Sequence, residues 1–188
     1  MPVTPSPSSG GGRRAWRVLA AAGLVVAALT VLGYSAWVLT SRRAIFAAIA
    51  DSAQSSAAAQ GAGTVSLATA RSNDALNAGW LWATTVVTVV ALLLWFGARV
   101  VARLRFGPVG FAGLAMLAVG LLVVVGGSYL SAMVDGDPDE AGMAVLGYSV
   151  TGGGFLLMSL GLLAGMLSLF RQPDAAAPQV GYAGWTSA

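Results

Sequence analysis

Phe106–Val134, FGPVGFAGLAMLAVGLLVVVGGSYLSAMV, runs without a single charged residue. An α-helix needs about 20 apolar residues to cross a hydrocarbon core about 30 Å thick. Three further uncharged stretches are long enough: Val18–Ser41, Asn77–Ala98 and Ala141–Phe170. We therefore predict an all-α integral membrane protein, a bundle of four transmembrane helices at about 17–41, 77–100, 108–134 and 141–170.

The composition fits a membrane protein and excludes several kinds of site chemistry. Only 9 % of the residues are charged, against about 25 % in soluble domains. The chain has no cysteine and no histidine, which excludes disulfides, zinc–cysteine centres, haem-ligating histidines and histidine acid–base catalysis. All ten basic residues are arginines, a usage that suggests a GC-rich bacterial genome. They cluster at the predicted membrane edges, so we expect them to contact anionic lipid headgroups and not nucleic acid.

The arginines also indicate the orientation of the chain. With four spans, both termini and the second connection share one side, which carries seven arginines: Arg13, Arg14, Arg17, Arg99, Arg103, Arg105 and Arg171. The opposite side carries Arg42, Arg43 and Arg71. Because cytoplasmic loops are enriched in arginine and lysine, we predict a multi-pass protein of the plasma (inner) membrane with both termini cytoplasmic. The predicted contacts with anionic lipid are Arg13, Arg14, Arg17, Arg99, Arg103 and Arg105.

The chain divides into a membrane domain, residues 16–170, and two tails. Residues 1–15 and 171–188 are rich in Pro, Ser, Gly or Ala, and we predict that both tails are disordered and cytoplasmic. Residues 42–78 form the only sizeable segment between spans. Their alanine-rich composition predicts an extracytoplasmic helical hairpin broken at Gln60–Gly63, with a flexible linker as the alternative. The other two connections are short, so we expect the second and third spans, and the third and fourth, to be antiparallel neighbours.

An acidic connection, Asp135–Glu140 (DGDPDE), precedes the fourth span. Its first half resembles a calcium loop in spacing, but a glycine at the sixth position and a glutamate at the twelfth are missing. Asp137 is better placed as a helix cap, with Pro138 in the first turn and Glu140 at the capping-box position. We therefore predict a helix cap formed by Asp137 and Glu140, and no metal site.

The fourth span is rich in glycine. Gly161 and Gly165 form a small-xxx-small pair, which allows a neighbouring helix backbone to approach closely, either within the monomer or in another subunit. Gly152, Gly153 and Gly154 are consecutive in the middle of the span, where we expect them to loosen or break the helix.

Nothing in the sequence resembles a catalytic site or a cofactor site, and the apolar runs lack the ionisable residues that proton-coupled transporters use. We predict a non-enzymatic accessory or assembly component that acts through helix packing, without cofactor or metal, with a membrane-protein partner or as a homo-oligomer. One alternative is a small channel or uncoupled permease lined by Thr84, Thr88 and the Gly152–Gly154 run. Another is a sensor that binds its signal through residues 42–78.

Overall fold

The computed structural model describes residues 9–54, 59–132 and 141–171, and these are helical except for Arg103–Gly107 and Arg171. The helices are α1 (Ser9–Trp37), η1 (Val38–Arg42), α2 (Arg43–Gln54), α3 (Ala59–Ala102), α4 (Pro108–Ala132) and α5 (Ala141–Phe170). Four helical stretches are long and apolar enough to cross a membrane: Gly11–Ala48, Leu76–Ala102, Pro108–Ala132 and Gly142–Phe170. The prediction of an all-helical chain with four helices of this length is confirmed for the described residues.

The first two predicted spans belong to longer helices than the apolar runs alone indicate. A π-helical turn, η1, joins α1 to α2, so the backbone stays helical from Ser9 to Gln54. The helix already exists over residues 9–15, which we expected to be disordered, because a helix nucleated in the apolar run propagates at one hydrogen bond per added residue. In the same way α3 runs for 44 residues and includes Gln60–Gly63, where the sequence predicted a break.

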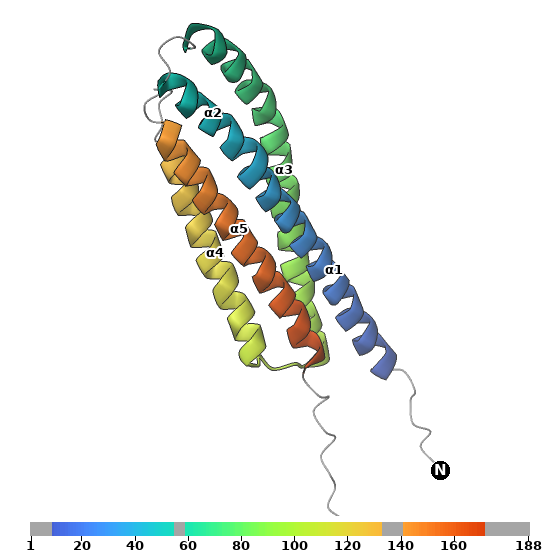
Figure 1. The fold of residues 1–188 in the computed structure, drawn as a ribbon. Coiled ribbons are helices and arrows are strands. Elements are labelled where there is room, and N and C mark those ends of the chain that lie inside the picture. The colour runs from blue at the N-terminus through green and yellow to red at the C-terminus, as the bar shows by residue number, and fades with distance from the viewer. Residues whose placement is uncertain (1–8, 55–58, 133–140, 172–188) are drawn as a thin grey trace, which may run out of the picture.

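The helices α1, α3 and α5 contact one another, and α4 packs on α5 at the edge of this group (Figure 1). The contact of α3 with α5 is smaller than those of α1 with each of them, and α2 packs on α5 and α3. Among the described elements, the backbone of α4 approaches that of α5 alone. The expectation that the second and third spans are neighbours was therefore wrong. Five connecting residues reach about 17 Å when extended, close to two helix–helix spacings, and the connection passes the lower end of α5.

Backbone hydrogen bonds define the first end of this connection, and a proline defines the second. The amide of Leu104 donates to the Arg99 carbonyl (2.9 Å) and that of Arg103 to the Val100 carbonyl (3.2 Å). This is the Schellman pattern that ends a helix, in which the residue after the cap adopts a left-handed conformation. Arg103 does so, with a φ of 52°. Pro108 then opens α4 at its first position, as the sequence predicted.

The buried core lies where α1, α3 and α5 meet. Its largest fully buried side chains include Leu24, Val31, Trp95, Leu162 and Leu169. In contrast, α4 buries mainly glycines: Gly110, Gly113, Gly120 and Gly127. The core therefore fixes α1, α3 and α5, while α4 is held by a different kind of contact.

Candidate functional site

The contact between α4 and α5 is a seam of facing glycines. A Cβ atom added to Gly161 would lie 2.8 Å from the carbonyl oxygen of Gly113, and one on Gly113 would lie 2.9 Å from the Gly161 oxygen. The same reciprocal relation, at 2.7–2.8 Å, joins two more pairs: Gly120 with Gly154, and Gly127 with Gly147. We call these three pairs the glycine seam. In lipid there is no hydrophobic force between helices, so such close backbone approach is a main source of their association.

The two predicted packing glycines therefore lie inside the monomer. Gly161 is part of the glycine seam, and Gly165 faces the ring of Trp95 in α3, whose nearest atom would lie 3.4 Å from an added Cβ. Both small residues contact neighbouring helices of the same chain. In this structure the pair is not an exposed surface for a second subunit.

The predicted break at Gly152–Gly154 is absent, since α5 is α-helical throughout Ala141–Phe170. The space left by two of the glycines is filled by neighbours: Gly152 faces Leu39 of η1 and Gly154 faces Gly120 and Val124 of α4. These contacts support the helix where isolated glycines would loosen it. Gly152 and Gly154 are therefore covered by different elements. The predicted cap, Asp137 and Glu140, lies outside the described residues.

Arg99 is placed differently from the prediction. We expected it to contact lipid headgroups, but its side chain is 3 % exposed. Its guanidinium donates to the Arg105 carbonyl (2.9 Å) and to the Ser168 hydroxyl oxygen of α5. It also lies over the rings of Trp95 (4.9 Å) and Phe106 (4.1 Å). The correction has a physical reason, since these carbonyl, hydroxyl and aromatic partners replace water around the cation.

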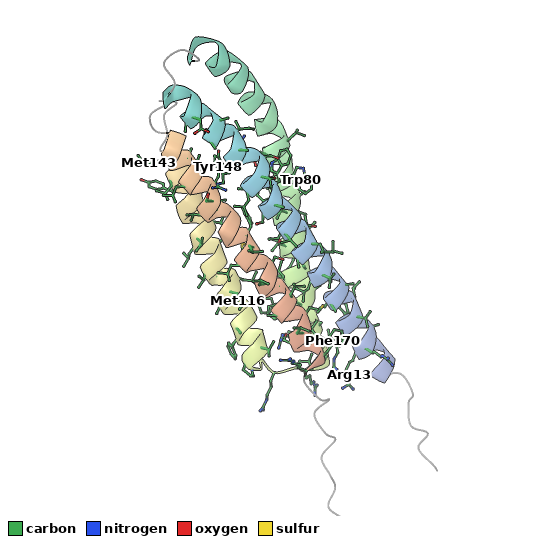
Figure 2. All side chains as sticks on the ribbon, in the orientation of Figure 1. Arg13, Trp80, Met116, Met143, Tyr148 and Phe170 are labelled. Carbon is green, nitrogen blue, oxygen red and sulfur yellow. The ribbon has the colours of Figure 1, made fainter. Side chains whose placement is uncertain are left out.

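A second buried arginine, Arg42, lies toward the opposite end of α5. Its guanidinium donates to the Tyr148 hydroxyl (3.2 Å) and lies 5.3 Å and 5.9 Å from the centres of the Tyr148 and Phe46 rings. Tyr148 lies in the upper half of α5, and Phe170 marks the other end of that helix (Figure 2). Two arginines from other elements thus contact α5 near its two ends.

Serines join the middle of α5 to α1. The Ser35 hydroxyl donates to the Gly152 carbonyl (2.7 Å), and the Ser159 hydroxyl donates to the Ala28 carbonyl (2.9 Å). Each bond runs from a buried side chain on one helix to a backbone oxygen on the other. Such bonds between membrane helices contribute about 1 kcal/mol or less each. They fix the register of α1 against α5.

The other predicted lipid-contacting arginines lie at one end of the molecule. That end holds the start of α1, the connection between α3 and α4, and the end of α5 (Figure 1). Arg17 is half-buried, and the rest are exposed: Arg13, Arg14, Arg103 and Arg105. Figure 2 labels Arg13 and Phe170 at this end of the molecule. The structure places these residues together without a membrane, so lipid contact stays a prediction.

Two signals in the sequence could have indicated these sites. The seam glycines are spaced seven residues apart in both predicted spans, at 113, 120 and 127 and at 147, 154 and 161. A seven-residue repeat keeps one helix face against its partner. Each buried arginine is also four residues from an aromatic residue, Trp95–Arg99 and Arg42–Phe46, the spacing at which helix side chains meet.

The described residues contain no group of three or more metal-ligating side chains. In comparisons with known proteins, no family model, curated protein or solved structure matches the chain.

Proposed function

We propose that this chain is a non-enzymatic membrane subunit that binds a partner membrane protein through the outer face of α4. In this proposal four spans cross the plasma membrane and both termini are cytoplasmic. The observation that carries the proposal is the one-sided packing of α4, whose backbone approaches α5 alone among the described elements. The opposite face of the helix is then available for lateral association.

The outer face of α4 carries large apolar side chains along its length. Phe111, Leu122, Val125 and Tyr129 are 61 %, 71 %, 59 % and 64 % exposed. Their spacing follows one helix face, on the side away from the glycine seam. Because the seam fixes the rotation of α4 against α5, the same four side chains are always presented outward. A pre-ordered face lowers the entropic cost of binding a partner.

The proposed orientation can be tested first, since the chain has no cysteine of its own. Gly11→Cys and Asp51→Cys place single thiols at exposed positions near opposite ends of the first long helical stretch. A membrane-impermeant maleimide added to intact cells is expected to label Asp51→Cys, and Gly11→Cys only after permeabilisation. The reverse pattern contradicts cytoplasmic termini.

Photo-crosslinking in native membranes tests the partner. Benzoylphenylalanine at Leu122 or Val125 is expected to give one discrete adduct larger than the monomer. The matched control is Leu93 of α3, which is 66 % exposed in another span and is expected to give only the monomer. The proposal fails if Leu122 and Val125 also give only the monomer, or if all three positions give the same adducts. An adduct of two copies of this chain would identify a homo-oligomer and exclude a different partner.

Purified protein reconstituted into liposomes tests the alternative function, a small channel or uncoupled permease. Efflux of small ions and solutes above that of empty liposomes would contradict a purely structural role. Among the described residues, the Thr84 and Thr88 hydroxyl oxygens are buried and have no hydrogen-bond partner. They lie on α3, whereas Gly152 is covered by η1 and Gly154 by α4. This separation favours the subunit proposal over the pore.

A further inference from the structure

A groove of about 300 Å³ lies between the first turn of α4 and the last turn of α5, and it is lined by Gly107, Pro108, Val109, Gly110, Ser168 and Arg171. The amide N–H groups of Val109 and Gly110 belong to the first helical turn, where no intrahelical carbonyl accepts them. The start of a helix also carries the positive end of its dipole. Arg171, which is exposed, adds a full positive charge to the lining. We call this the α4–α5 groove.

The buried guanidinium of Arg99 lies behind the wall of this groove. It donates to Ser168, a lining residue, and its Nη2 atom would lie 2.8 Å from a Cβ added to Gly110, another lining residue. Its Nε atom is buried without a hydrogen-bond partner. The partners of its other nitrogens are neutral oxygens, so its charge is not neutralised by them.

A buried cation at the edge of a membrane is costly unless a negative charge lies near it. The positive end of the α4 dipole is opposed at this place by the negative end of the α5 dipole, so the charges of Arg99 and Arg171 are what favour an anion there. An apolar side chain is also exposed at this end of α5, since Phe170, the neighbour of the lining residue Arg171, is 59 % exposed. A ligand with a phosphate and attached hydrocarbon chains meets both requirements, whereas free phosphate uses only the first.

We propose that the α4–α5 groove binds the phosphate of an anionic glycerophospholipid, with the acyl chains lying along the apolar surface of α4 and α5. Arg171 contacts the phosphate directly, the first-turn amides of α4 donate to it, and Arg99 contributes its charge from behind Ser168. The proposal is independent of the partner proposed for the outer face of α4. Each can fail without the other.

Native mass spectrometry of the full chain, released from detergent with added lipid, tests the proposal. Phosphatidylglycerol is expected to remain bound as one molecule per chain, and phosphatidylcholine of the same chain length is not. Millimolar inorganic phosphate is expected not to displace the lipid. Displacement by phosphate would show a free-anion site and overturn the lipid, and equal retention of both lipids would overturn the site.

The variants locate the binding within the molecule. Arg171→Gln is expected to weaken phosphatidylglycerol binding about fivefold, the effect of one arginine near an anionic lipid. Arg14→Gln is the matched control, because it removes an exposed arginine at the same end of the chain but outside the groove. Arg99→Gln is expected to lower retention further, provided that it folds. If Arg14→Gln weakens binding as much as Arg171→Gln, the effect is general surface charge and the groove is not the site.

Discussion

The middle of the glycine seam offers the sharpest test of the packing. A methyl group at residue 154 would lie 2.8 Å from the Gly120 carbonyl oxygen and 2.8 Å from the Val124 amide nitrogen. Ordinary van der Waals contact begins near 3.4 Å, so α4 must move away by about 0.6 Å. Both opposing atoms belong to the backbone and cannot rotate aside. A gap of this size removes a quarter to a half of the attraction between the atoms it separates.

From this displacement we expect Gly154→Ala to lower the free energy of unfolding by about 1–3 kcal/mol, the usual cost of overpacking. Gly120→Ala is expected to act similarly, because its added Cβ would lie 2.8 Å from the Gly154 carbonyl oxygen. Both substitutions push α4 and α5 apart at the same contact. The double variant should therefore lose less than the sum of the two, by at least about 0.5 kcal/mol.

Adjacent glycines on the same helices supply the controls. Gly126 and Gly153 have no atom within 4 Å of an added Cβ. Gly126→Ala and Gly153→Ala are therefore expected to be neutral, or more stable by up to about 1 kcal/mol through the higher helix propensity of alanine.

The assay is equilibrium unfolding in mixed detergent and dodecyl sulfate micelles. Energy transfer between fluorophores on cysteines, introduced at the exposed positions Ala118 and Leu156, reports the separation of α4 from α5. The seam is refuted if Gly154→Ala unfolds at the same point as Gly153→Ala. It is also refuted if both control variants lose as much stability as the seam variants.

Four further substitutions test other contacts by the same unfolding measurement. Arg103→Gly is expected to stabilise the protein by about 1 kcal/mol, because glycine adopts the φ of 52° without steric cost; a loss of stability would contradict the helix end described above. Ser159→Ala removes the hydrogen bond to the Ala28 carbonyl, and Ser35→Ala removes the one to the Gly152 carbonyl. Each is expected to lower the free energy of unfolding by at most about 1 kcal/mol. If the unfolding curve is unchanged for both variants, these bonds do not hold α1 on α5. Thr88→Val replaces a buried hydroxyl that has no partner and is expected to be neutral or stabilising, whereas clear destabilisation would mean that the hydroxyl is hydrogen-bonded in the membrane.

The sequence by itself determined the helical class and the number of spanning-length helices, because each apolar run is longer than a membrane requires and carries no charge. It also determined that α4 starts at Pro108, since proline at the first helical position loses no hydrogen bond. These features depend on local composition and on the chain's own backbone. No partner helix is needed to explain them.

Only the tertiary structure decided which helices are neighbours and which side chains are buried. A five-residue connection predicts adjacency, yet it passes the end of α5 and leaves α4 against α5 alone. Because Arg99 lies at the end of an apolar run, the sequence predicts that it contacts lipid, yet it is buried and donates to Ser168 and to the Arg105 carbonyl. From Gly154 and its neighbours the sequence predicts a loosened or broken helix, yet the Gly120 backbone fills the space beside Gly154. In each case the deciding atom belongs to a residue distant in sequence or to the far side of a turn, and local pattern carries no information about where that atom lies.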